Sequence, residues 1–298
     1  MRSVLGTPNP LLGHLSFAQT IALGALAGFT IFLGLPVGRL QLLDRRARVA
    51  LAMFSVGVLA FIFVDVMSNG LSIVDDALHA VKDGHGSTAY LIWLVVLLAG
   101  GFAAGSAGLA TLERRMQPAA TRRPPIAGGA QTATLEGEPL VGELDAARRR
   151  ALRVGLTIAA AIGVHNFAEG LAIGVSARAG AISLATVLII GFALHNATEG
   201  FGIVGPLGDV KPSWGWIGLA GLIGGGPTFL GSIVGYAVTS HPLELAFYAT
   251  AGGAILYVIG EIWNGMRRYG HRELGLLMVS AGFLVGVITD LIVTYGGG

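Results

Sequence analysis

The amino-acid sequence predicts an all-α membrane protein with eight transmembrane helices, and three observations support this fold class. First, 53% of the 298 residues are hydrophobic and only 12% are charged, whereas a soluble domain carries about 25% charged residues. Second, the mean hydropathy is +0.72. Third, the apolar residues are concentrated in runs long enough to cross a bilayer, which takes about 20 residues in a helix.

Pro, Gly or charged residues separate eight apolar runs, and each run predicts one span. The first run is long for the core of a signal peptide, and Arg2 is the only basic residue before it. We therefore interpret it as a retained span rather than a cleaved signal. In chain order the predicted spans cover residues 16–37, 48–69, 88–110, 152–176, 181–204, 215–238, 244–263 and 274–295.

One connection between the spans is much longer than the others. Residues 111–150 separate three spans in 1–110 from five spans in 151–298, and they contain Pro118, Pro124, Pro125 and a Gly128-Gly129 pair, followed by a polar run. This composition is typical of a flexible linker. We expect a single membrane domain whose two sets of spans are joined by this linker.

The basic residues predict the orientation of the chain. Sixteen of the 19 Lys and Arg residues fall on connections that lie on one side of the membrane, and only Arg2, Lys82 and Arg178 fall on the other. By the positive-inside rule the first side is cytoplasmic. With eight spans, both termini then lie outside, and the linker is cytoplasmic.

The remaining composition excludes several classes of function. A formal net charge of +2 is too small to suggest nucleic-acid binding. The chain has no Cys, which excludes disulfides and thiolate metal ligands. Gly is frequent, with 47 residues, and small residues let membrane helices approach closely.

A glycine-rich stretch in the sixth predicted span has two interpretations. It could pack tightly against a neighbouring helix, or it could loosen the helix near mid-membrane and open backbone carbonyls toward a cavity. The stretch consists of Gly221, Gly224, Gly225, Gly226 and Pro227.

The motif His-Asn-x-x-Glu-Gly occurs at residues 165–170 and again at 195–200, each time inside a long apolar run. His165 and Glu169 are four residues apart, as are His195 and Glu199, so each pair lies on one face of its helix. Ionisable residues at membrane depth are costly and usually functional. Two similar motifs on oppositely directed helices would also arise from an inverted repeat with its site near the midplane.

These four side chains predict a site for one divalent ion. No Lys or Arg lies between Arg153 and Arg178, or between Arg178 and Lys211, so neither Glu has a cationic partner in its own span. Nitrogen and oxygen ligands without sulfur suit Zn²⁺, Fe²⁺, Mn²⁺, Co²⁺ or Cd²⁺ and disfavour Cu⁺. The alternative is a pair of buried core histidines without a ligand.

The asparagine that follows each histidine, Asn166 and Asn196, has three candidate roles. It could bind the ion weakly, hydrogen-bond a side chain that binds the ion, or only bridge two helices. We favour the second role.

At these residues the chain resembles the ZIP (Zrt-, Irt-like) family of divalent metal transporters. Members carry His-Asn-x-x-Glu-Gly in the fourth span and a related motif in the fifth. They have eight spans, both termini outside and a long cytoplasmic loop after the third span. The resemblance covers nearly the whole chain in layout and is sharp at 165–170 and 195–200.

The resemblance implies a metal site formed by His165, Glu169, His195 and Glu199. It implies that the chain is not an enzyme and has no resident cofactor, and that it carries a divalent transition metal, Zn²⁺ above all, into the cytoplasm. Alternating access of the elevator type and a bacterial inner (cytoplasmic) membrane are further implications, and a homodimer is compatible with them.

The chain departs from the family pattern in ways that matter for the site. Many members have Pro where Ala168 and Thr198 stand, so any proline kink is missing. Some members bind a second ion through added carboxylates, and here the corresponding Asn166, Asn196 and Gly226 are uncharged. We therefore expect one ion rather than a bridged pair. The linker 111–150 contains no His, which argues against a metal-sensing loop.

Three further acids lie within the predicted spans. Asp65 and Asp290 are placed toward the outer halves of spans two and eight, where they could form an entry funnel for cations or act as interfacial acids. Glu261 is near the inner end of span seven, where it fits an exit path or a side chain that snorkels to water. A cluster in the following outer connection is better explained as a solvated linker: Asp75, Asp76, His79, Asp83 and His85.

Three rival functions remain open at this stage. An intramembrane metalloenzyme is disfavoured because the chain has neither His-Glu-x-x-His nor a Glu-x-x-His pair of the di-iron type. A metal-gated channel or receptor would use the same ligands without saturable transport. The sequence also gives no direction, so export is an alternative to import.

Overall fold

The computed structural model describes residues 15–40, 44–116, 138–178, 193, 195–237, 240–267 and 269–296, and these residues are predominantly helical. Seven described helical segments are long and apolar enough to cross a membrane. The fifth predicted span, 181–204, lies largely outside the described residues, apart from a helix at 195–204. The seven segments are Phe17–Leu40, Arg45–Lys82, Thr88–Thr111, Leu144–Val175, Trp214–Ala237, His241–Arg267 and Arg272–Ile292.

The first three spans begin at side chains that cap the helix. The Ser16 hydroxyl accepts from the backbone N–H of Gln19 in a capping box, and Asp44 accepts from Ala47. Such caps satisfy N–H groups that have no partner in the first turn. The elements are α1 (Phe17–Phe29), α2 (Ile31–Gly34), α3 (Val37–Leu40), α4 (Arg45–Lys82), α5 (Thr88–Ala103), the π-helix η1 (Ala104–Gly108) and α6 (Leu109–Met116).

The second half of the chain carries the longest helix. The helices of this half are α7 (Glu138–Arg178), the helix at 195–204, the 3₁₀ helix η3 (Gly205–Leu207), α9 (Trp214–Ala237), α10 (His241–Arg267) and α11 (Arg272–Gly296). The predicted linker 111–150 differs from the structure at both ends, since α6 reaches Met116 and α7 begins at Glu138. Ala, Leu, Glu and Arg in the segment before the membrane are good helix formers, and they continue α7 out of the bilayer.

Two expectations on helix continuity need correction. The predicted outer connection after span two is largely helical, because α4 runs on to Lys82, so Asp75, Asp76 and His79 lie on a helix rather than in a loop. The Gly-rich stretch does not break its span, since α9 is continuous through Pro227. In a membrane, neighbouring helices hold such a segment in place, and tight packing is the interpretation that the structure supports.

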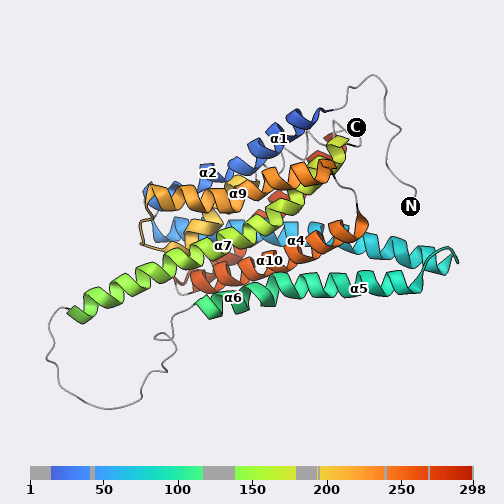
Figure 1. Ribbon diagram of the computed structural model, residues 1–298. Coiled ribbons are helices and arrows are strands. Elements are labelled where there is room, and N and C mark those ends of the chain that lie inside the picture. The colour runs from blue at the N-terminus through green and yellow to red at the C-terminus, as the bar shows by residue number, and fades with distance from the viewer. Residues whose placement is uncertain are drawn as a thin grey trace, which may run out of the picture.

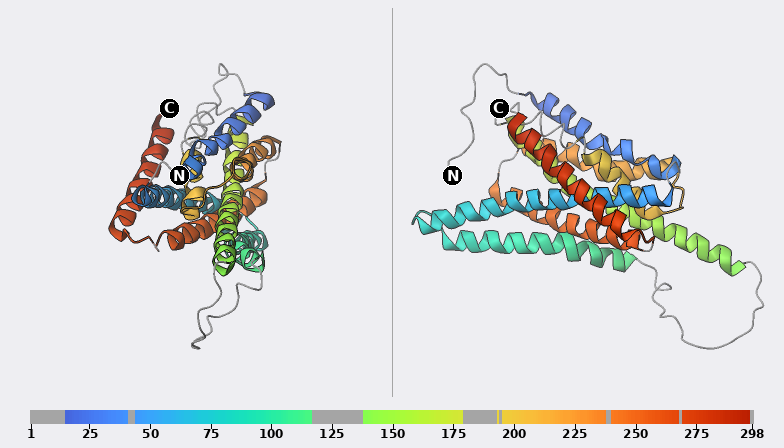
Figure 2. Two further views of the ribbon diagram at one scale, coloured as in Figure 1. Left: turned by 90° about the vertical axis from the view of Figure 1, so that its left-hand side faces the viewer. Right: turned by 180° about the vertical axis from the view of Figure 1, so that it is seen from behind.

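The helices form two groups. One, the site-bearing group, consists of α1, α2, α7, the helix at 195–204 and α9. Among the described elements α7 and α9 have the most extensive contact, and α7 also packs along α10 of the other group. The other, the supporting group, consists of α4, α5, η1, α6, α10 and α11, in which α11 crosses α4 (Figure 2). Figure 1 shows α1, α2 and α9 on one side of α7, and α4, α10 and α5 on the other.

Within each group, glycines bring backbones into direct contact. A Cβ atom added to Gly170 of α7 would lie 2.8 Å from the Ser232 nitrogen of α9, and one added to Gly282 of α11 would lie 3.0 Å from the Val58 nitrogen of α4. Real Cβ atoms are hardly ever that close to a backbone that cannot move. These helix pairs are therefore locked together over their glycine faces.

Across the boundary between the groups, the glycine contacts are of another kind. The atoms nearest to a Cβ at Gly202 are the Cδ1 of Ile262 at 3.2 Å and the Cβ of Ser55 at 3.7 Å. At Gly265 of α10 the nearest atom is the Cβ of Pro206 at 3.6 Å. At these two glycines the nearest atoms belong to side chains, whereas within the groups the glycines meet backbone atoms. A displacement at these points therefore requires side chains, and not backbones, to give way.

Candidate metal site

The two His-Asn-x-x-Glu-Gly motifs lie on α7 and on the helix at 195–204, inside the site-bearing group. The helical period brings each His over its Glu. His165, Glu169 and Glu199 are buried, with at most 4% of each residue exposed. The His195 side chain is 14% exposed. The four side chains thus lie in the interior of a membrane-spanning bundle.

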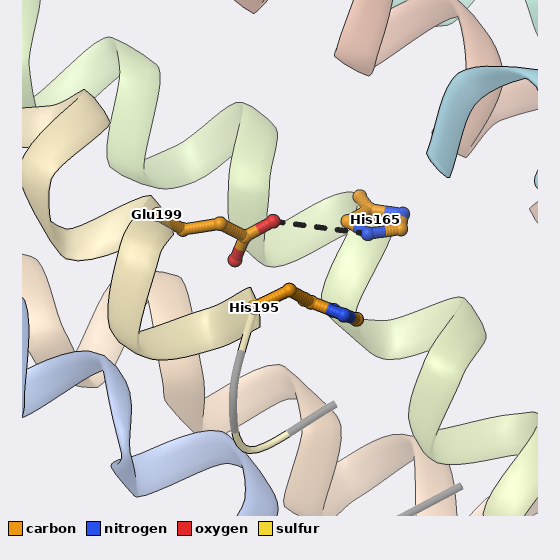
Figure 3. A group of neighbouring side chains, drawn as sticks. All are labelled: His165, His195 and Glu199. Carbon is orange, nitrogen blue, oxygen red and sulfur yellow. Dashed lines mark ion pairs between the residues drawn. The ribbon is translucent and has the colours of Figure 1, made fainter. Parts of the chain in front are cut away.

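Three of these side chains point toward a common centre. One ligand atom each from His165, His195 and Glu199 can be chosen so that all three lie within 4.8 Å of one another. The Nε2 of His165 is 3.8 Å from the Oε1 of Glu199, and Figure 3 shows the two imidazoles and the carboxylate facing the same space between their helices.

The fourth predicted residue, Glu169, lies against both imidazoles. Its Oε1 is 2.9 Å from the Nε2 of His165 and also pairs with the Nε2 of His195. The structure therefore brings all four predicted residues together, and each of the two helices supplies one His and one Glu.

The donor set fits a divalent ion better than it fits a closed network of protein groups. Within the described residues, the charged partners of Glu169 and Glu199 are the two histidines. The buried Nδ1 of His165 and the Oε1 of Glu199 have no hydrogen-bond partner there. Buried carboxylates without a cation are costly, and a bound divalent ion would neutralise them.

A tetrahedral zinc site sets a scale for the geometry. Bonds of about 2.0–2.2 Å separate neighbouring ligand atoms by roughly 3.3 Å. The distance of 3.8 Å between the Nε2 of His165 and the Oε1 of Glu199 is slightly longer than this ligand–ligand separation. Small side-chain rotations would therefore close the site around an ion.

The asparagines make different contacts. The Asn166 amide donates to the Oε2 of Glu199 at 3.2 Å and to the backbone oxygen of Gly224 in α9 at 2.9 Å. It thereby orients a candidate ligand from the neighbouring helix. Asn196 donates to the backbone oxygen of Ala27 in α1 at 3.0 Å, which bridges two helices.

One contribution from α9 was not anticipated. The backbone oxygen of Gly224 holds the Asn166 amide that orients Glu199. The glycine cluster was the available signal, because a backbone without side chains can approach a buried polar group. Sequence alone did not show which carbonyl would face the site.

The three predicted pathway acids lie outside this cluster. Asp65 on α4 and Asp290 on α11 are exposed, and Asp65 accepts from the amide of Asn69 at 3.3 Å. Asp65 is close enough to interact electrostatically with Asp290, Glu169 and His165. Glu261 is half-buried on α10. Asp65 and Asp290 therefore lie near each other, as an entry funnel would require, without reaching the site.

Known zinc transporters share sequence similarity with this chain. A family model described as "ZIP Zinc transporter" matches residues 131–259. The "Zinc transporter ZupT" of Clostridium perfringens (strain 13 / Type A) is 32% identical over 166 residues, which are 53% of this chain and 56% of the relative. In this alignment the chain therefore spans about half the length of that relative.

A second relative aligns over almost the whole chain. The "Zinc transporter ZupT" of Corynebacterium aurimucosum (strain ATCC 700975 / DSM 44827 / CIP 107346 / CN-1) is 24% identical over 288 residues, which are 93% of this chain and 97% of the relative. The region matched by the family model contains both motifs. With its membrane-spanning helices and its buried His/Glu cluster, the chain is similar to the ZIP family of zinc transporters over the region that carries both motifs.

Proposed function

We propose that this protein carries a divalent transition metal ion, with Zn²⁺ as the physiological substrate, into the cytoplasm by alternating access. His165, Glu169, His195 and Glu199 bind one dehydrated ion at mid-membrane. Fe²⁺, Mn²⁺, Co²⁺ and Cd²⁺ are further candidate substrates, because imidazole and carboxylate ligands accept all of them.

The observation that carries this proposal is the buried cluster itself. Two carboxylates and two imidazoles meet inside the bundle, and within the described residues no Lys or Arg forms an ion pair with either carboxylate. A cation that enters such a site replaces its water shell with protein ligands and supplies the missing positive charge. Both relatives are named as zinc transporters, which favours zinc as the substrate.

A single ion per chain follows from the residues beside the site. Asn166 and Asn196 are neutral, and no side chain is available at Gly226. A second divalent ion a few ångströms away would need further carboxylates to offset its charge. Asn166 is instead occupied with Glu199 and Gly224.

The two groups of helices support an elevator-type mechanism. Both motifs belong to the site-bearing group, which is internally locked by glycine contacts to backbone atoms. Its boundary with the supporting group is formed by side-chain contacts such as Gly202 with Ile262. A rigid-body displacement along that boundary would carry the site past the supporting group without unpacking either one.

The orientation follows from charge. The start of α4, the ends of the linker and the turn between α10 and α11 lie at one end of the bundle (Figure 1), and they carry most of the Arg residues. This end is assigned to the cytoplasm, in a bacterial inner membrane with both termini outside. The two motifs are assigned to an inverted repeat, and the linker to the cytoplasm between the two sets of spans.

The rival functions, a metalloenzyme, a metal-gated channel or receptor and an exporter, predict different behaviour toward the metal. The family consists of transporters rather than enzymes, which disfavours a metalloenzyme. A channel would conduct zinc without saturating at low concentration, and an exporter would move it in the opposite direction.

Uptake of radioactive zinc into oriented proteoliposomes tests the proposal, with bound metal counted in detergent. Wild-type protein should take up zinc saturably and bind one ion per chain. The His165→Ala/Glu199→Ala double variant should lose both. A matched control, Asp75→Ala/His79→Ala, removes an exposed His/Asp ion pair from α4 and should change neither. Equal zinc binding by the wild type and the His165→Ala/Glu199→Ala variant would refute the assigned site. Zinc binding by the wild type without zinc uptake would refute the carrier function.

A further inference from the structure

A cavity of about 430 Å³ opens at the cytoplasmic end of the supporting group, away from the metal site. Its volume lies within the range of ligand pockets, about 300–1,000 Å³. Residues from the start of α4, the end of α10 and the start of α11 line it. It therefore lies where three spans leave the membrane.

The cavity has an apolar floor and a basic rim. Met53 and Met266 are buried, and Trp263 is half-buried beside them. The rim is formed by Arg267, His271 and Arg272, whose residues are exposed. No acidic residue is among the lining residues that the structure describes.

The rim cations differ from two other described arginines at this end, Arg48 and Arg39. Arg48 pairs with Asp209 at 2.8 Å. Arg39 donates to the Pro212 oxygen at 2.7 Å and stacks on Trp214. In the described part of the chain, Arg267 and Arg272 form no ion pair and no side-chain hydrogen bond. Their charge is thus available to a ligand.

The location of the cavity identifies the class of ligand. An apolar floor at the level where helices enter the bilayer is open to acyl chains, and unpaired Arg and His at the water boundary match a phosphate group. Basic pockets between membrane helices on the cytoplasmic side bind anionic head groups. A soluble anion would use the rim but not the floor of Met and Trp.

We propose that this cavity binds one anionic phospholipid of the cytoplasmic leaflet. The phosphate lies between Arg267 and Arg272, His271 adds an N–H donor, and the glycerol and upper acyl chains pack on Trp263 and Met53. This site is separate from the metal site; it rests on the proposed orientation of the chain in the membrane but not on zinc transport.

Native mass spectrometry of the detergent-purified full chain tests the proposal, with phosphatidylglycerol as the probe. Wild-type protein should retain one phosphatidylglycerol and release phosphatidylcholine. Arg267→Gln/Arg272→Gln should weaken retention about 30-fold, the loss expected for two Arg near an anionic surface. The control Arg148→Gln/Arg149→Gln removes equal charge from an exposed part of α7 on the same side and should leave retention unchanged.

Three outcomes would overturn the proposal. Equal weakening in both double variants would show general electrostatic attraction. Equal retention of phosphatidylcholine would show an apolar surface without charge recognition. Displacement of the lipid by millimolar inorganic phosphate would show a soluble-anion site. In lipid-free detergent, Arg267→Gln/Arg272→Gln should have the same melting temperature as wild type. His271→Gly, which removes the rim donor, should also match wild type, because glycine adopts the backbone φ of 57° at this position freely.

Discussion

Relative motion of the two helix groups can be tested by cross-linking them. A Cβ atom at Gly202 would lie 3.7 Å from the Cβ of Ser55 on α4. Disulfides span Cβ separations of about 3.5–4.5 Å, with a mean near 3.8 Å, so Ser55→Cys/Gly202→Cys should form one without moving the backbone. The chain contains no other Cys, which leaves a single disulfide to form.

The geometry also fixes the size of the effect. The disulfide confines the two Cβ atoms to a window about 1 Å wide, so any longer slide of the site-bearing group is blocked. Zinc uptake should therefore fall in proportion to the cross-linked fraction, while one ion still binds per chain. The cost to the reduced protein is about 1 kcal/mol, because the Ser55 hydroxyl loses its contact with the Thr198 oxygen at 2.8 Å.

The assay is zinc uptake into proteoliposomes after oxidation with diamide, then again after reduction. Gly70→Cys/Tyr248→Cys is the control, since it joins α4 to α10 inside the supporting group. Its Cβ separation of 3.3 Å is slightly below the disulfide range, so a small local shift is needed for this bond to form. Its disulfide should leave uptake unchanged. Undiminished uptake by fully cross-linked Ser55→Cys/Gly202→Cys protein would refute motion along this boundary.

Three other expectations follow from the structure. Gly170→Ala should lower the free energy of unfolding by about 1–3 kcal/mol, because the new Cβ overlaps the α9 backbone. Gly226→Ala should be neutral or stabilising, because no atom of a neighbouring element lies within 4 Å of its Cβ. Melting curves in detergent that rank the two variants in the opposite order would contradict this packing. Asn166→Ala should weaken zinc binding about 10–100-fold without changing the one-ion stoichiometry, as read by calorimetry, and unchanged affinity would remove its orienting role. Zinc affinity should fall on acidification because protons compete with the metal for imidazole and carboxylate, so equal affinity at about pH 5 and about pH 8 would count against the assigned ligands.

The sequence predicted the spans and the site more accurately than it predicted helix ends. A hydrophobic run identifies the part of a helix inside the bilayer, and seven of the eight runs correspond to described membrane-spanning candidates. Outside the bilayer, hydropathy carries no information on helix length. That is why the continuation of α4 to Lys82 and of α7 back to Glu138 went unpredicted.

The site could be predicted from the sequence because four-residue spacing on a helix is a local property. His165 lies over Glu169 wherever α7 is placed. The contacts of Asn166 and Asn196 depend on which backbone carbonyl of α9 or α1 comes near, and only the packed structure gives that. The behaviour of Pro227 was equally undetermined, because neighbouring helices decide whether a proline breaks a membrane helix.

The length of α7 gives the site a mechanical connection to the cytoplasm. Its 41 residues make a rod of about 60 Å, roughly twice the thickness of the hydrocarbon core. A helix without an internal break moves as one piece, so a shift or tilt at His165 is transmitted to the start of α7, which projects beyond the other helices (Figure 1). A fluorophore there would act as a pointer, and its displacement would report each turnover in real time without disturbing the metal ligands.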